Sequence, residues 1–123
     1  MITYLTIGTN DLAKATAFFD QLFADLSAKR AYQTDRLVAW QFAEKAPLFI
    51  VNEPFDEQQA TVGNGSMVAL QADSPEMVDR MHALALSLGA TDEGAPGYRG
   101  KQFYGGYFRD LDGNKFNFHH IRF

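Results

Sequence analysis

The first half of the chain shows a strand-like pattern, then a helical pattern, then strand-like patterns again. Residues 2–8 combine loosely alternating polarity with the β-branched side chains that strands favour. A helix-start signal follows at residues 9–11, Thr-Asn-Asp, whose side chains can cap the free N–H groups of a first turn. The apolar stripe of this helix recurs at helical spacing and comprises Leu12, Ala15, Phe18, Phe19, Leu22, Phe23 and Leu26. Further strand-like stretches are residues 36–42 and 47–52, with a weaker one at 31–34.

The same order of patterns returns in the second half. Residues 67–72 resemble a strand, and Ser74 followed by Pro75 predicts a helix start, because Pro in the first turn gives up no hydrogen bond. The apolar stripe of this helix comprises Met77, Met81, Leu84, Ala85 and Leu88, and Gly89 favours its end. Strand-like stretches then cover residues 91–93, 102–109 and 115–121, the last two joined by a turn-like run at 110–114.

A change in amino-acid composition separates the two halves. Residues 54–65 contain charged residues, glutamines and two glycines in place of an apolar pattern, as surface linkers do. We therefore expect half one at 1–53, a linker at 54–65 and half two at 66–123. The repeated order indicates an α+β fold of two tandem βαβββ modules. One such module leaves a face of its sheet uncovered, so two are expected to form a curved mixed sheet around a central cavity.

Composition narrows the possible functions. A chain of 123 residues is long enough for a single domain, and eleven Phe, five Tyr and one Trp suffice both to fill a core and to line a cavity. The formal net charge of −4, with scattered basic residues, argues against a nucleic-acid partner. The absence of Cys excludes disulfides and Cys-ligated zinc. No apolar run approaches the length that crosses a membrane, so a cytoplasmic protein is expected.

Three stretches carry a resemblance to a known family. They are Gly65–Leu70, Gly89–Arg99 and Tyr107–Lys115, and the most specific piece is the Asp-Gly-Asn of residues 112–114. With the opening residues 5–12, they make the chain resemble the vicinal oxygen chelate superfamily, which includes glyoxalase I, extradiol dioxygenases, and fosfomycin- and bleomycin-resistance proteins. The resemblance implies the paired βαβββ fold that the pattern also indicates, and it implies a homodimer.

The resemblance also implies where a metal would be bound. Catalytic relatives hold a divalent ion with His and Glu side chains from four strands. The corresponding positions here are Tyr4, Met67 and Asn117, and the fourth lies within residues 48–51, which contain no acid. Phenol, thioether and amide are poor ligands for such an ion. We therefore predict no metal and no cofactor, as in the metal-free branch of the family typified by bleomycin-resistance proteins.

Candidate ligand-binding residues follow from strand phase and residue chemistry. Alternation along strands sends His119 and His120 to opposite faces, so they cannot share one ion, and His119 shares the face of Asn117. The glycine-rich stretch 94–106 is expected to form a loop over the cavity mouth, where Arg99 can pair with an anionic ligand. His82 lies off its helix's apolar stripe and is expected to be solvated. The full candidate set is Tyr4, Thr6, Trp40, Met67, Arg99, Asn117 and His119; no catalytic residue is assigned.

Three functions remain open on the sequence. The first is a metal-free protein that binds an amphipathic or aromatic small molecule in the cavity. The second is a metal-dependent lyase or dioxygenase with an atypical ligand set that includes His119 and Glu53. The third is an interaction module whose cavity is filled by its own side chains. The sequence does not identify the ligand.

Overall fold

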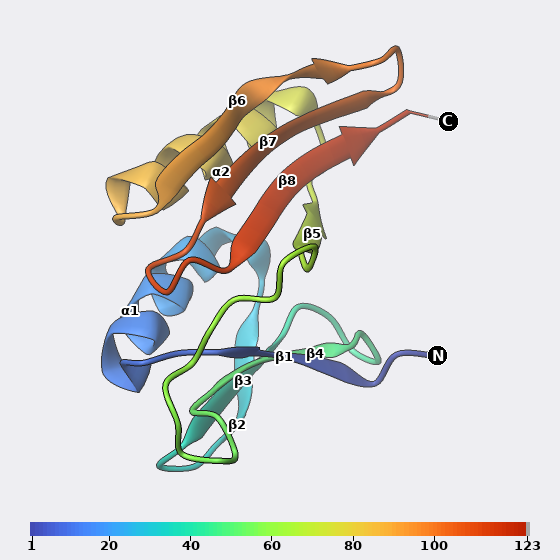
Figure 1. Cartoon of the computed structure of the whole chain (residues 1–123). Helices are drawn as coiled ribbons and strands as arrows, with labels where there is room; N and C mark the ends of the chain where they lie inside the picture. The colour runs from blue at the N-terminus through green and yellow to red at the C-terminus, as the bar shows by residue number, and fades with distance from the viewer. Residues whose placement is uncertain (123) are drawn as a thin grey trace. The chain divides into compact units, whose positions relative to one another are not determined.

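The computed structural model describes residues 1–122, and the chain divides into two compact units, Met1–Val62 and Gly63–Phe123. Each unit consists of a strand, an α-helix and three further strands, and each has its own four-stranded mixed sheet (Figure 1). This confirms the predicted α+β class and the two tandem βαβββ modules. Within residues 1–122, no helix is both long and apolar enough to cross a membrane.

The first unit has its strands in the order β1-β4-β3-β2, with β1 parallel to β4 and the other pairs antiparallel. Its helix begins after Asp11, whose side chain accepts a hydrogen bond from the backbone N–H of Lys14. The element bounds are β1 Tyr4–Gly8, α1 Leu12–Leu22, a 3-10 turn at Ala24–Leu26, β2 Lys29–Gln33, β3 Leu37–Gln41 and β4 Leu48–Asn52.

The core of the first unit is an aromatic cluster between α1 and its sheet. The ring of Phe19 lies 5.8 Å from that of Trp40 and 5.0 Å from that of Phe49, measured between centroids. The indole Nε1 of Trp40 donates a hydrogen bond of 3.0 Å to Asp20, a carboxylate that also pairs with Arg30. This pairing with Arg30 lowers the pKa of Asp20. One face of the sheet is therefore covered by α1.

The second unit repeats the arrangement, with its last three strands longer than those of the first unit. Its strand order is β5-β8-β7-β6, with β5 parallel to β8, and Ser74 caps the helix by accepting from the N–H of Met77. The helix packs on the sheet through Val78, Met81 and Ala85, all fully buried. The element bounds are β5 Val68–Gln71, α2 Pro75–Ser87, β6 Thr91–Arg99, β7 Phe103–Arg109 and β8 Lys115–Ile121.

The glycine-rich stretch 94–106 is not the loop that the sequence predicted. Residues 91–99 form β6, which pairs antiparallel with β7, and only 100–102 make the turn between them. Gly100 has a φ of +82°, a backbone conformation that residues other than glycine rarely adopt. The other glycines of the stretch lie within paired strands, where they make room for neighbouring side chains.

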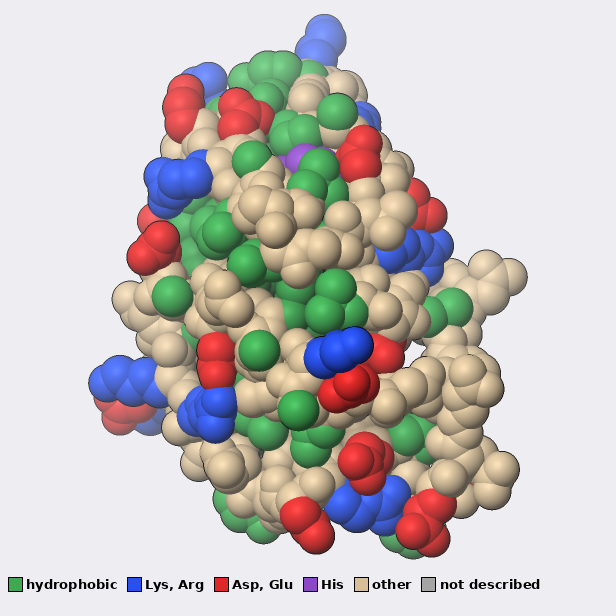
Figure 2. All heavy atoms as spheres, turned by 90° about the vertical axis from the view of Figure 1, so that its left-hand side faces the viewer, with side chains coloured by type: hydrophobic (Ala, Val, Ile, Leu, Met, Phe, Trp, Pro, Cys, Tyr) green, Lys and Arg blue, Asp and Glu red, His purple; other side chains and the backbone are tan. Residues whose placement is uncertain are grey.

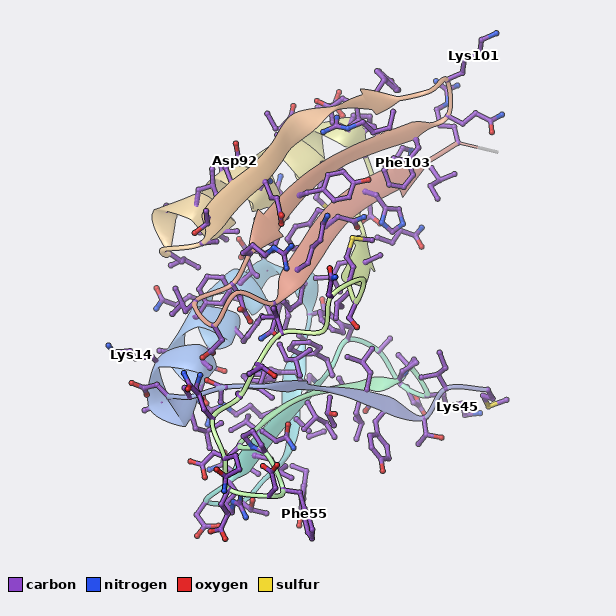
Figure 3. The ribbon with its side chains drawn as sticks, viewed as in Figure 1. Lys14, Lys45, Phe55, Asp92, Lys101 and Phe103 are labelled. Atoms are coloured by element: carbon purple, nitrogen blue, oxygen red, sulfur yellow. The ribbon has the colours of Figure 1, made fainter. Side chains whose placement is uncertain are left out.

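His82 is buried, contrary to the expectation that it is solvated. Its side chain is only 4% exposed, and its Nε2 lies 3.0 Å from Oδ1 of Asp92 on β6, a residue labelled in Figure 3. The apolar stripe predicted from periodicity is narrower than the buried face of α2. The reason is that α2 contacts β6, β7 and β8, whereas α1 contacts mainly β4. The histidine therefore ties the helix to the outer strand.

Candidate functional site

The sheet of the second unit has one face under α2 and one face free of it. Phe108 on β7 contacts His82 of α2 and stacks with Phe116 of β8, so these side chains face the helix. In Figure 1, α2 lies behind β6, β7 and β8. Alternation along the strands sends their neighbours to the other face. We call this the open face; its charged, aromatic and polar side chains include Met67, Glu93, Arg99, Phe103, Tyr107, Arg109, Lys115, Asn117 and His119.

Three of the predicted site residues form a bonded chain on the open face. Asn117 Nδ2 lies 3.9 Å from Met67 Sδ, and Asn117 Oδ1 lies 3.0 Å from His119 Nδ1. An amide oxygen can only accept, so His119 Nδ1 carries the proton and Nε2 keeps its lone pair. Asn117 is buried, and it fixes both neighbours from the middle of β8.

His119 is held as a neutral acceptor. Burial lowers the pKa of His119, and the nearby His120 lowers it further. The ring stacks on Phe103 of β7, with centroids 5.3 Å apart and an angle of 13° between planes; Figure 3 labels Phe103. The Nε2 lone pair of His119 is thus suited to accept a hydrogen bond from a ligand.

Two cationic side chains lie close to the ring of Tyr107. The guanidinium carbon of Arg99 and the ammonium nitrogen of Lys115 each lie 5.5 Å from the centroid of its ring. Tyr107 is directly opposite Asn117 in the β7–β8 register. Tyr107 therefore lies on the same face as the Met67–Asn117–His119 chain and next to it, with Lys115 on β8 and Arg99 on β6.

Two of the predicted site residues lie on the first sheet's face away from α1. Tyr4 and Thr6 alternate with Leu5, and Leu5 pairs with Phe49, which faces α1. Thr6 lines a hollow of about 350 Å³, one side of which is formed by residues 54–61 of the predicted linker. These residues are held to the first unit by hydrogen bonds between Asn10 and Ala60.

Trp40 does not share the face of Tyr4 and Thr6, which corrects its assignment as a ligand-binding wall. It is 2% exposed and packs on Phe19 and Phe23 of α1. All but the last of the β3 residues 37–41 are apolar, so the sequence gives no alternation from which to read the face. Packing against the helix decides it.

The residues at the family's metal positions do not fit a divalent ion. Tyr4, Met67 and Asn117 offer a phenol, a thioether and an amide, and Leu48–Val51 of β4 contribute no oxygen or nitrogen donor from their side chains. Glu53, invoked for an atypical ligand set, is ion-paired with Arg36 at 3.4 Å. Among residues 1–122, no group of three or more His, Asp or Glu side chains lies close enough to hold a metal.

Sequence reasoning missed three contributors to the open face, namely Phe103, Tyr107 and Lys115. The available signal was the set of glycines at 94, 97 and 105, spaced among aromatic and basic residues. Glycines in a strand often mark close approach of another group, which here is the side chain of Arg99 or Phe103. The same glycines instead suggested a loop.

Comparison with solved structures identifies relatives over the full length of the chain. A glyoxalase/bleomycin resistance protein from Albidiferax ferrireducens T118 is 34% identical, with 99% of both chains covered and a TM-score of 0.89. A glyoxalase/bleomycin resistance protein/dioxygenase family enzyme from Burkholderia phytofirmans PsJN is 18% identical, with 98% of each chain covered and a TM-score of 0.79. A lactoylglutathione lyase from Agrobacterium tumefaciens is 19% identical, with 98% of this chain and 92% of that one covered and a TM-score of 0.75.

Neither the models of protein families nor the curated proteins give a match. The likenesses below 25% identity concern the fold alone. The Albidiferax ferrireducens protein is more similar in sequence and matches end to end, and its structure has the same fold. The chain therefore belongs to the glyoxalase/bleomycin resistance/dioxygenase family, within the vicinal oxygen chelate superfamily.

Proposed function

We propose that this chain is a metal-free member of its family that binds an amphipathic or aromatic small molecule on the open face of the second sheet. The proposal rests chiefly on the Met67–Asn117–His119 chain. At the family's metal positions in the second unit, Met67 and Asn117 contact each other, and the amide oxygen of Asn117 accepts a hydrogen bond from His119. These groups are engaged in orienting a neutral histidine, which is a use compatible with binding an organic ligand.

The surroundings of this chain support the same function. Phe103 and Tyr107 give the face half-buried aromatic surface, while His119 Nε2 supplies an acceptor. A small-molecule site is typically apolar and aromatic, with a few oriented polar groups. A homodimer and a cytoplasmic location, which the family resemblance implies, are part of this proposal and are checked by sedimentation and by cell fractionation.

Metal content tests the proposal directly. The native chain, purified without affinity metals and then exposed to Zn²⁺, Ni²⁺, Mn²⁺ or Fe²⁺, is expected to bind none stoichiometrically, as measured by elemental analysis and calorimetry. The Met67→His/Asn117→Glu variant is expected to gain binding of a borderline ion such as Zn²⁺, because the two side chains already lie within contact distance.

The matched control is Met67→Leu/Asn117→Gln, which alters the same positions without adding ligands and is expected to bind no ion. Stoichiometric metal in the native chain would overturn the proposal. Binding of the neutral probe phenylacetamide, seen as NMR shifts of the Asn117 and His119 amides, would support the ligand-binding role. Enzyme assays would be the next step only if the native chain took up metal.

A further inference from the structure

The open face holds more positive charge than its own carboxylates neutralise. Its charged side chains are Arg99, Arg109, Lys115 and Glu93. Glu93 is bound on both oxygens by Arg109, with Arg109 NH2 2.9 Å from Oε1 and Nε against Oε2. Within residues 1–122, Arg99 and Lys115 have no carboxylate within 4 Å. With three cations and one carboxylate, the charged side chains of the face thus sum to +2, on a chain whose formal net charge is −4.

Arg99 is exposed, and two backbone carbonyl groups of its own strand hold its guanidinium. Its NH1 donates to the carbonyl of Gly97 at 3.0 Å and its NH2 donates to the carbonyl of Ala95 at 2.9 Å. The guanidinium lies 5.5 Å from the centroid of Tyr107. These contacts use two of the five N–H donors of the group, so the others remain for a ligand. Holding Arg99 in advance lowers the entropy that a ligand must overcome.

The glycines of β6 permit this arrangement. A Cβ at Gly94 would lie 3.2 Å from NH2 of Arg99 and one at Gly97 would lie 3.2 Å from NH1, both tighter than ordinary contacts. A Cβ at Gly105 of β7 would lie 2.5 Å from the Phe103 ring. Both Arg99 and Phe103 therefore lie flat on the sheet, over positions that have no side chain. The result is a cation beside an aromatic surface.

We propose that the ligand of the open face is an aromatic acid whose carboxylate or phosphate is bound by Arg99 and Lys115 beside Tyr107. This inference rests on the proposed function and adds the charge of the ligand to it. Arg99 supplies oriented donors and Lys115 a second charge on the same tyrosine. The stacked rings of Phe103 and His119 provide the aromatic surface. Phe103 lies on β7, the strand of Tyr107, and His119 lies on the adjacent strand β8.

The test compares ligands that differ only in charge. Phenylacetate and its neutral isostere phenylacetamide are titrated into the full chain, with binding followed by NMR. Phenylacetate is expected to bind about tenfold more tightly at low salt, and added salt is expected to reduce that preference. Phenyl phosphate in the same assay distinguishes a phosphate ligand from a carboxylate ligand by the higher affinity of one of the two.

Variants locate the preference on the named residues. Arg99→Gln and Lys115→Gln are each expected to remove most of the tenfold preference, and Arg99→Lys to restore only part of it, because lysine lacks the planar fork. The control is Arg80→Gln, which changes net charge equally at an exposed position of α2. Arg99 and Arg80 are exposed and Lys115 is half-buried, and circular dichroism checks that all four variants fold.

The outcomes separate this inference from the proposed function. Equal affinity for phenylacetate and phenylacetamide, unchanged in Arg99→Gln, would overturn the anionic ligand while leaving the small-molecule function standing. A preference for the acid that Arg80→Gln abolishes as fully as Arg99→Gln would also overturn it. Absence of binding by all three probes would contradict both proposals.

Discussion

At the scale of single residues, Asn117 determines what His119 can do. Because its neutral amide oxygen accepts from Nδ1 at 3.0 Å, it orients the ring without stabilising the charged form as a carboxylate does. We expect Asn117→Asp to raise the pKa of His119, measured by NMR titration of the ring protons. Ala83→Glu, which adds the same charge on α2, is the control and should leave the titration nearly unchanged. An equal rise in both variants would contradict the orienting role.

The lowered pKa of His119 also predicts how stability depends on pH. The folded chain binds a proton at His119 less readily than the unfolded chain, whose histidine has the ordinary value of 6.5. The contribution of His119 is therefore fully present above that value and is lost as the pH falls through the lowered folded pKa. Denaturant midpoints between neutral and mildly acidic pH should fall more in the native chain than in His119→Gln. Equal slopes would refute this.

Strand alternation and family resemblance placed some of the candidate residues on one face of a sheet. Met67, Asn117 and His119 were placed together from strand alternation and family resemblance, and they are bonded in the structure. Trp40 was misplaced because β3 is apolar on both faces, so only its contact with α1 reveals its side of the sheet. His82 was misplaced because its burial depends on β6 and β7, which follow it in the chain and supply Asp92 and Phe108 as its partners.

At the scale of elements, the approach of α2 to β7 depends on Gly106. A Cβ there would lie 2.9 Å from Nδ1 of His82 and 3.0 Å from Cγ of Pro96. His82 cannot retreat, because it is buried against Phe108 and tied to Asp92. We expect Gly106→Ala to reduce the free energy of unfolding by about 1–3 kcal/mol, measured by denaturant titration.

Gly63→Ala is the matched control for that substitution. Its Cβ would meet only the side chain of the exposed Ser66, with Oγ at 2.5 Å and Cβ at 3.1 Å; the hydroxyl can rotate away, so its effect is expected to be smaller. Equal effects of the two substitutions would show that the contact with His82 does not set the helix–strand distance.

The elements themselves were largely readable from the sequence, except where glycine served packing. Ser74 and the run Thr-Asn-Asp at residues 9–11 were recognised as helix starts, and in the structure Ser74 and Asp11 accept the capping hydrogen bonds. Residues 94–99 were taken for a loop because glycine lowers strand propensity. In the structure, the side chain of Arg99 folds back over Gly94 and Gly97 of its own strand, β6, an interaction that strand propensity does not report.

At the scale of the whole molecule, the two βαβββ units are unequal. The strands of the first unit are all five residues long, whereas β6, β7 and β8 have nine, seven and seven. The cations and the bonded histidine lie on the longer sheet. On the face of the molecule shown in Figure 2, acidic and basic side chains are interspersed.

The segment between the last strand of one unit and the first strand of the next should be where the native chain is first cut by a protease. Phe55 is 96% exposed in a stretch without strand or helix, whereas Tyr32, at 60% exposed, is paired within β2. Proteolysis needs a backbone that can leave its hydrogen bonds, so exposure alone does not suffice. Limited chymotrypsin digestion followed by mass spectrometry should therefore show cleavage after Phe55 before cleavage after Tyr32. Phe55→Ala should delay the first cut, and Tyr32→Ala should not. Early cleavage at Tyr32 would contradict the prediction, because it would mean that the edge strand β2 opens more readily than the segment joining the units.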